Sequence, residues 1–414
     1  MVKSLYICYF GVREPLVQTQ VIPYLRELVK GGHELTLLTF EPGEVDEGAV
    51  RESLKADGIE WHWLKYHKRP SVPATMFDIA NGARYIRKLA AEKNFDILHC
   101  RSHVPTMMAA VARKGMRRKP RLLFDIRGFL FDEYADAGVW ARDGLLYKSA
   151  KSIERWLLKE SDGFVVLTEA ARNELFPESA TTFRDKFDRP VEVIPCCVDF
   201  ESRFSETSRY SKVDLKRALE IEDRRVITHL GALGGLYLTK ELADLIACAR
   251  SIDPRVFAIF LTQSSPEMIA PLLKERGLND EDYLIRRVGA HEVPRYLLAS
   301  DIGLSFVTAS YATMSRSPTK IPEYLASGLP VIANTGVGDT DKQLTEDRTG
   351  VLVDKFEGST LARAVAETLE LLEDDDLAER CRRSSRARFD LGKVGGERYR
   401  RLYGNIADSK IASS

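Results

Sequence analysis

Short apolar segments alternate with amphipathic ones along almost the whole chain, and this alternation constrains the fold more than any other feature. Residues 5–10, 96–100 and 164–167 are strand-like, whereas residues 18–30, 76–93 and 145–159 repeat apolar side chains with the period of a helix. A basic helix is expected over residues 377–403. Residues 164–167, Phe-Val-Val-Leu, are apolar at every position, so both faces of that strand would be buried. The pattern predicts an α/β fold with doubly wound parallel sheets covered by helices.

The alternation pauses once, over a polar, serine-containing segment from residue 199 to residue 210. A chain of 414 residues is too long for one ordinary core, so the strands and helices after this segment predict a second domain. We expect a first Rossmann-like domain over residues 1–198, and a linker with a second Rossmann-like domain over residues 199–385. Ligands of such sheets bind beyond the carboxyl ends of the strands, so we expect the domains to face each other across a cleft.

The composition favours a soluble protein without a nucleic-acid partner. Lysine and arginine together number 61, as do aspartate and glutamate, so no overall field attracts nucleic acid. The six cysteines contain no C-x-x-C pair, which is typical of reduced thiols in a cytoplasmic protein. The first apolar run is too short for a signal peptide, and no stretch reaches the ~20 apolar residues of a membrane-spanning helix. We therefore expect a cytoplasmic location.

The most informative segment lies at residues 315–333, where a predicted strand leads into a predicted helix. Ser317 and Thr319 would lie at the start of that helix, where free backbone amides favour an anion. Lys320 would add a full positive charge, and Glu323, one turn further, could accept hydrogen bonds from paired hydroxyls. The same spacing fits a plain surface helix on which Lys320 and Glu323 form a solvated pair.

This segment also resembles a known family. Residues 317–333, Ser-Pro-Thr-Lys-Ile-Pro-Glu-Tyr-Leu-Ala-Ser-Gly-Leu-Pro-Val-Ile-Ala, resemble the donor-site signature of glycosyltransferase family 4. Other motifs similar to those of the family occur in the expected order, at residues 31–34, 96–99, 164–168, 193–199 and 289–304. The resemblance implies a GT-B architecture, with two facing Rossmann-like domains and a terminal helical segment, residues 386–414, that crosses back to the first domain.

The resemblance also implies an activity. Such a protein would be a retaining, metal-independent glycosyltransferase that moves a sugar from a nucleoside-diphosphate sugar, UDP favoured over GDP, to a glycan, glycolipid or small acceptor. Cell-surface polysaccharide synthesis would be its setting, and no cofactor beyond the nucleotide sugar is implied. Asp280-Glu281-Asp282 matches the D-x-D pattern of metal-using glycosyltransferases, but three acids in a turn are more typically solvated. The alternatives are a nucleotide-sugar epimerase of similar fold and a non-catalytic sugar-nucleotide-binding protein.

The resemblance assigns roles to several residues of the second domain. Glu323 would hold the donor ribose, whereas Ser317, Thr319 and nearby amides would hold the diphosphate. Charge develops on the departing diphosphate during transfer, and fixed cations stabilise it. Lys320 is the main candidate for this catalytic role, with Arg316 beside it at the donor site.

Two departures from the family pattern leave the contacts to the donor sugar open. Ser315 stands where the family often has a second glutamate, and Ala232 stands where it often has an arginine. Gly234 and Gly235 follow shortly after, and they would let backbone amides approach the phosphates closely. A plain turn that requires glycine explains the same pair.

In the first domain, Arg127 occupies the place of a histidine that faces the sugar in the family. An arginine there can bind a phosphate or carboxylate through two parallel hydrogen bonds, or can form a structural pair with Asp125 or Asp132. His103 is the alternative catalytic candidate, although a lone histidine more often has a structural role. Gly11 and Arg13, in the first loop, are candidates for contacts with the donor.

A basic segment from Arg113 to Arg121 carries six positive charges in nine residues. Such a segment is usually a solvated turn. If the acceptor is lipid-linked, the same charges would attract anionic headgroups and hold the protein at the inner face of the membrane.

Overall fold

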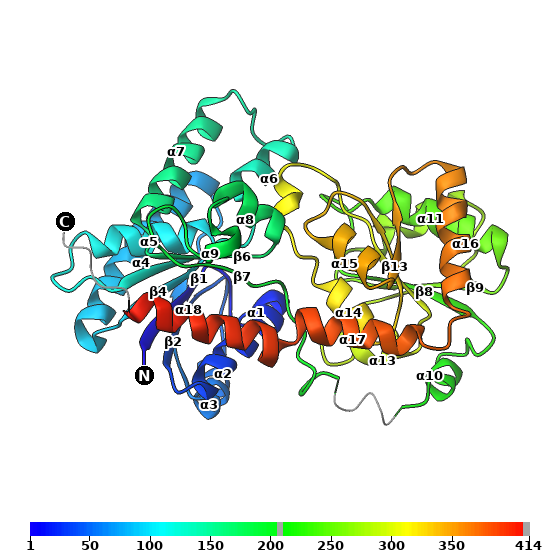
Figure 1. Cartoon of the computed structure of the whole chain (residues 1–414), viewed down its shortest axis with the longest axis horizontal. Helices are drawn as coiled ribbons and strands as arrows, with labels where there is room; N and C mark the ends of the chain where they lie inside the picture. Colours follow the sequence, from blue (N-terminus) through cyan, green and yellow to red (C-terminus); the bar gives the residue numbers. More distant parts are fainter. Residues whose placement is uncertain (205–209, 409–414) are drawn as a thin grey trace. The chain divides into compact units, whose positions relative to one another are not determined.

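The computed structural model describes residues 1–204 and 210–408 (Figure 1). The chain forms two compact units, each built around one parallel sheet. Unit 1 comprises Met1–Pro195 and the chain from Leu391 onward, and unit 2 comprises Cys196–Asp390. The predicted α/β class is therefore confirmed. The domain boundaries at 198/199 and 385/386, and the cleft between facing domains, stay predictions.

Unit 1 holds a parallel sheet in the order β3-β2-β1-β4-β5-β6-β7. The central strand β4 is buried at every position, as the apolar runs of the sequence indicate. The strands are β1 Lys3–Cys8, β2 Glu34–Glu41, β3 Ile59–Lys65, β4 Ile97–Arg101, β5 Arg121–Asp125, β6 Gly163–Val166 and β7 Val191–Val193.

Most helices of unit 1 connect successive strands. A helix predicted over residues 18–30 is instead two helices that meet at Val21, because Pro23 in the next turn has no N–H to continue the backbone hydrogen bonds. The helices are α1 Pro15–Gln20, α2 Ile22–Lys30, α3 Glu47–Ala56, α4 Ser71–Lys93, α5 His103–Arg113, α6 Leu130–Asp136, α7 Leu145–Glu160, α8 Glu169–Leu175 and α9 Ser179–Thr182.

Unit 2 holds a second parallel sheet, in the order β10-β9-β8-β11-β12-β13. Side chains alternate between two hydrophobic clusters, so that Val226 packs on one face of β8 and Ile227 on the other. The cluster that contains Val226 includes residues of α14 and α17, and the cluster that contains Ile227 includes residues of α11 and α16. The strands are β8 Arg225–Leu230, β9 Val256–Leu261, β10 Tyr283–Arg286, β11 Ile302–Ser305, β12 Val331–Asn334 and β13 Gly350–Val353.

The helices of unit 2 follow the same strand–helix alternation. They are α10 Lys212–Ala218, α11 Thr239–Ile252, α12 Ala270–Glu275, α13 Val293–Leu298, α14 Lys320–Ala326, α15 Thr340–Glu346, α16 Gly358–Leu371 and α17 Leu377–Phe389, with short 3-10 turns η2 Pro266–Met268 and η3 Ala312–Ser315.

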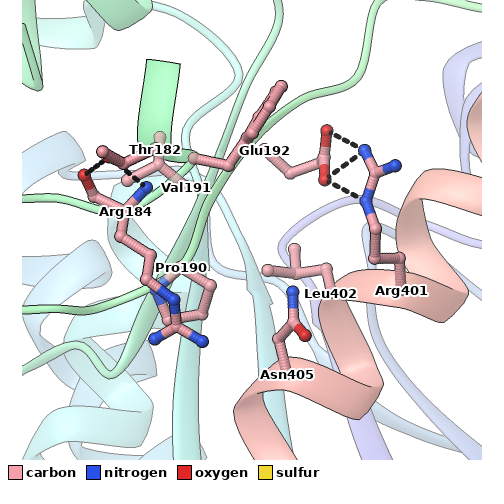
Figure 2. Close-up of a pocket in the computed structure, with 9 residues that line it drawn as sticks. Thr182, Arg184, Pro190, Val191, Glu192, Arg401, Leu402 and Asn405 are labelled. Atoms are coloured by element: carbon pink, nitrogen blue, oxygen red, sulfur yellow. Dashed lines mark hydrogen bonds and ion pairs between the residues drawn. The ribbon is translucent and has the colours of Figure 1, made fainter. Parts of the chain in front are cut away.

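The last helical segment is interrupted, contrary to the single helix predicted over residues 377–403. Helix α17 ends at Phe389, a π-helical turn η4 (Leu391–Gly396) follows, and α18 (Glu397–Asp408) packs on unit 1. Glycines in η4 weaken the helix at this point. Arg401 of α18 bonds the buried Glu192 of β7 through both carboxylate oxygens, at 2.8 Å each (Figure 2). The hollow beside this pair is lined by none of the predicted site residues.

Candidate functional site

Helix α14 is fixed in place by Tyr324, whose ring is completely buried. The Tyr324 hydroxyl donates to the Leu304 carbonyl oxygen (3.0 Å) and accepts from the Leu230 amide (2.7 Å). Gly303 leaves room for the ring, since a Cβ atom at that position would lie 2.4 Å from it. The start of α14 is therefore held at the carboxyl ends of β8 and β11, where parallel sheets bind ligands.

Lys320, the first residue of α14, is a buried cation. It exposes 4% of its surface, and its Nζ atom has no hydrogen-bond partner among residues 1–204 and 210–408. Nζ lies 4.5 Å from the centre of the Tyr237 ring. Burial lowers the pKa of Lys320 to about 7. Burial, and then the nearby Lys320 charge, lower the pKa of His229 well below its usual value, so that this neighbour is neutral. An anion would complete this site.

The loop after β8 passes beside Lys320. A Cβ atom at Gly231 would lie 3.4 Å from the Lys320 Nζ atom, and Gly231 has a φ of 117°. Gly234 and Gly235, the predicted donor-binding glycines, also have positive φ. The Gly234 amide donates to the Thr239 hydroxyl at 2.8 Å. Glycine is thus required by the turn, and the turn brings the backbone close to the buried cation.

Glu323 lies one turn along α14 and exposes 7% of its surface. Its carboxylate accepts hydrogen bonds from both terminal nitrogens of Arg203, at 2.7 and 3.3 Å. Arg203 also donates to the Ala290 carbonyl oxygen at 3.0 Å. The alternative of a solvated Lys320–Glu323 pair is therefore wrong, because both side chains are buried and Glu323 pairs with Arg203. The sequence gives no local signal for this partner, which lies 120 positions away.

The other predicted residues of this segment, Arg316, Ser317 and Thr319, are half-buried. The Ser317 hydroxyl accepts a hydrogen bond from the Cys196 amide at 3.1 Å. Thr319 occupies the N-cap position of α14, but its side chain makes no capping bond. Arg316 follows the 3-10 turn η3, and its amide donates to the Thr313 carbonyl oxygen. Ser315, in the place of a family glutamate, donates to the Ala312 carbonyl oxygen at 2.6 Å. The donor-binding roles of Arg316, Ser317 and Thr319 stay predictions.

In unit 1, Arg127 follows β5 and bonds Asp125, with Nη1 3.4 Å from Oδ1. Asp125 is fully buried and also accepts from the Tyr399 hydroxyl at 3.0 Å. Asp132, the other predicted partner of Arg127, bonds Tyr147 and Lys151. The structure thus contains the Arg127–Asp125 pair, and the catalytic role of Arg127 stays a prediction.

The remaining candidates of unit 1 have different surroundings. His103 begins α5, is buried, and lies 3.1 Å from Glu154 through its Nε2 atom, which are the contacts of a structural histidine. Gly11 packs against Glu41, since a Cβ atom there would lie 2.8 Å from the carboxylate. Arg13 is exposed. Their substrate roles also stay predictions.

Within residues 1–204 and 210–408, no group of three or more histidine, cysteine, aspartate or glutamate side chains is placed to hold a metal ion. In the D-x-D stretch, Asp280 pairs with Lys274 and Asp282 pairs with Arg250. No helix in this part of the chain is long and apolar enough to cross a membrane.

Two Rossmann-like units, each built on one parallel sheet, place the protein in the class of GT-B folds. The sequence matches the model of Glycosyltransferase Family 4 over residues 17–202 and that of glycosyl transferases group 1 over residues 213–388. The chain belongs to the group 1 glycosyltransferases of family 4. No curated protein matches the chain in sequence.

Solved structures share the fold over almost the whole chain. A glycosyltransferase from Rickettsia africae is 17% identical, with a TM-score of 0.70 and 99% of each chain covered. Sucrose-phosphate synthase from Thermosynechococcus elongatus is 14% identical, with a TM-score of 0.72 and coverage of 98% and 100%. HepE from Anabaena, in complex with UDP and glucose, is 15% identical, with a TM-score of 0.67 and the same coverage. At these identities the likeness concerns the fold.

Proposed function

We propose that the protein is a retaining, metal-independent glycosyltransferase that uses a UDP-sugar and acts on a glycan, glycolipid or small acceptor in cell-surface polysaccharide synthesis. The observation that carries the donor site is Lys320, which lies beside the loop at Gly231, is buried, and has no hydrogen-bond partner for its Nζ atom within residues 1–204 and 210–408. A diphosphate bound at this site would balance the positive charge of Lys320. The structure of the fold neighbour HepE was solved with UDP-glucose, which supports UDP as the nucleotide of the donor.

The chemistry assigned to each residue follows from its environment. Glu323 would accept hydrogen bonds from the ribose hydroxyls, with its carboxylate held by Arg203. Lys320 would neutralise the charge that develops on the leaving diphosphate. Burial strengthens this interaction because the surrounding dielectric is low. The nucleotide sugar is proposed as a co-substrate, without a separate cofactor.

Transfer is favoured over epimerisation. A putative UDP-N-acetylglucosamine 2-epimerase from Listeria monocytogenes shares the fold, with a TM-score of 0.61 and 13% identity. The family models matched by both halves of this chain are, however, those of glycosyltransferases. The fold likeness to the epimerase adds no argument about its chemistry.

A panel of UDP-, GDP-, ADP- and dTDP-sugars tests the donor site by thermal shift. We expect UDP-sugars to raise the melting temperature, because a ligand at 100 times its Kd adds about 2.7 kcal/mol to stability. Glu323→Ala should weaken UDP binding about tenfold through lost charge-assisted hydrogen bonds. The control is Glu367→Ala, which removes an exposed carboxylate paired with Arg363 in the same unit. Unchanged UDP affinity in Glu323→Ala would contradict the ribose role.

We also propose peripheral contact with anionic lipid through the segment from Arg113 to Arg121. Lys114, Arg117 and Lys119 are exposed there, while Arg113 pairs with Asp162. On α7, which contacts α5, the apolar Leu145 and Leu146 are 84% and 58% exposed. Co-sedimentation with vesicles tests this contact. Binding to phosphatidylserine-containing vesicles and not to phosphatidylcholine vesicles is expected, and equal absence of binding to both contradicts it.

A further inference from the structure

Three neighbouring strands of unit 1 end in reactive side chains at the same level of the sheet. The register aligns Cys8 of β1 with Arg101 of β4, and Arg101 with Asp125 of β5. Arg127 follows two residues after Asp125. These residues lie at the carboxyl ends of their strands, where parallel sheets bind ligands. Arg101 was not among the residues predicted from the sequence.

Arg101 is a buried charge with few bonds of its own. It exposes 4% of its surface, and its Nη1 atom donates to the Gln20 carbonyl oxygen at 3.3 Å. In the described ranges, 1–204 and 210–408, no carboxylate lies within salt-bridge distance of Arg101, and the bond to Gln20 is the one hydrogen bond of its side chain. A guanidinium has five N–H donors, and burial of such a charge without a counter-ion is costly.

The Asp125 carboxylate attracts the Arg101 guanidinium, but its Oδ1 atom is bonded to Arg127. Burial alone would raise the pKa of Asp125, but the charges and hydrogen bonds of Arg127, His99 and Arg101 outweigh it and hold this pKa far below its usual value. Burial raises the pKa of Cys8 to about 11, so the thiol is neutral. Burial also lowers the pKa of His99, which is therefore neutral near pH 7. In the cluster formed by these five residues, one carboxylate faces two guanidinium groups.

We propose that Arg101, together with Arg127, binds an oxyanion carried by a substrate, a carboxylate or a phosphate. The planar donor fork of a guanidinium matches both groups through paired hydrogen bonds. The inference rests on the proposed function, since it concerns a substrate of sugar transfer, and it goes further by giving that substrate a negative charge. The charge has two sources: an acid group on the donor sugar, or an acid or phosphate group on the acceptor.

Inorganic phosphate is the first probe, measured by calorimetry on the full chain. Lys320→Met serves as the background, because it removes the buried cation of unit 2, which would bind phosphate as well. In this background we expect phosphate to bind, and Arg101→Met to weaken binding about tenfold, as expected for a lost charge-assisted hydrogen bond. Arg101→Lys keeps the charge but loses the donor fork, so its affinity should lie between the two.

The matched control is Arg189→Met, which removes a half-buried guanidinium of unit 1 that already has a carboxylate partner, Asp185, at 2.6 Å. This variant should keep the phosphate affinity of its parent. Equal phosphate affinity with and without Arg101 would overturn the inference, as would no phosphate binding in the Lys320→Met background. Should Arg101→Met fail to fold, Arg101→Lys decides: an affinity equal to that of the parent overturns the inference, and a lower one supports it.

Two further arms identify the source of the charge. If the donor sugar carries it, UDP-glucuronate binds more tightly than UDP-glucose, and Arg101→Met abolishes that preference. If the acceptor carries it, glucose 6-phosphate binds the UDP-saturated protein more tightly than glucose does, again through Arg101. Flat results in both arms, with UDP-glucose still bound, overturn this inference alone. Failure of every UDP-sugar to bind the wild-type chain contradicts the proposed function instead.

Discussion

Single residues decide how the donor site responds to pH. Burial lowers the pKa of Lys320 to about 7 in the protein without ligand. A bound diphosphate favours the charged form and raises this pKa, so binding takes up a proton above pH 7. Affinity for UDP-glucose should therefore be highest below pH 7 and fall with rising pH, by at most about tenfold per pH unit. Isothermal titration calorimetry from about pH 6 to about pH 9, a range that includes the pKa of Lys320, measures how UDP-glucose affinity changes with pH.

The choice of ligand and control isolates Lys320 in that titration. A terminal phosphate titrates near pH ~6, whereas the diphosphate of UDP-glucose is esterified at both ends. Lys320→Arg keeps a permanent charge, so its affinity should not vary over the same range. An equal pH slope in both proteins would show that another group causes it.

Arg203 is the second residue whose role can be tested at this scale. It holds the Glu323 carboxylate through two hydrogen bonds, so Arg203→Met should release that carboxylate from its orientation. We expect UDP affinity to fall about tenfold and the preference for UDP over 2′-deoxy-UDP to shrink, as both depend on a fixed carboxylate. Calorimetry with the two nucleotides measures both effects. Tighter UDP binding would mean that Arg203 instead competes with the ribose for Glu323.

These residues also show where prediction from the sequence ends. Lys320 and Glu323 were predicted as site residues because they are three positions apart, at the start of one predicted helix. Arg203 and Arg101 were missed because their environment is set by residues distant in sequence, such as Glu323 for Arg203 and Asp125 for Arg101. Sequence spacing gives neighbours within a helix, whereas pairing between strands and loops depends on the folded sheet.

At the scale of elements, strands such as β6 and β9 were predicted well because buried parallel strands are continuous apolar runs. The errors lie in helix continuity. The break at Val21 and the π-helical turn η4 depend on individual proline and glycine residues. Helical periodicity is judged over a window of many residues, so such single positions have little effect on the prediction.

The contact between β11 and α14 gives a prediction at the same scale. Gly303→Ala would place a Cβ atom 2.4 Å from the buried Tyr324 ring, and neither the ring nor the strand has room to move. We expect a loss of about 1–3 kcal/mol in the free energy of unfolding, as for other overpacked cores, together with weaker UDP binding as α14 shifts. Urea denaturation followed by calorimetry measures both.

A second glycine provides the control for that change. Gly358, at the first position of α16, is exposed and has no atom within 4 Å of its ideal Cβ. Gly358→Ala should leave stability unchanged or raise it by up to about 1 kcal/mol, because alanine favours a helix. If Gly303→Ala were equally harmless, Tyr324 would not be what fixes α14.

At the scale of the whole molecule, the path of the chain determines which unit should stay folded when the C-terminal segment is removed. Unit 2 is one continuous segment, Cys196–Asp390, whereas unit 1 needs α18 from beyond that segment. Helix α18 buries Leu402 and Ile406, and its Tyr399 and Arg401 bond the buried acids Asp125 and Glu192. Loss of α18 would remove these bonds, although Asp125 would keep Arg127, and it would uncover the apolar surface packed against Leu402 and Ile406.

A chain that ends at Asp390 should therefore have a destabilised unit 1 and an intact unit 2. Differential scanning calorimetry should show unit 1 unfolding at a lower temperature than in the full chain, or no transition for it at all. The transition of unit 2 should remain, and UDP should raise its midpoint in both proteins, because Lys320, Arg203 and Glu323 all belong to that unit. If the shortened chain lost the UDP-dependent transition, the nucleotide site would depend on residues outside unit 2, and its assignment to the ends of β8 and β11 would be incomplete.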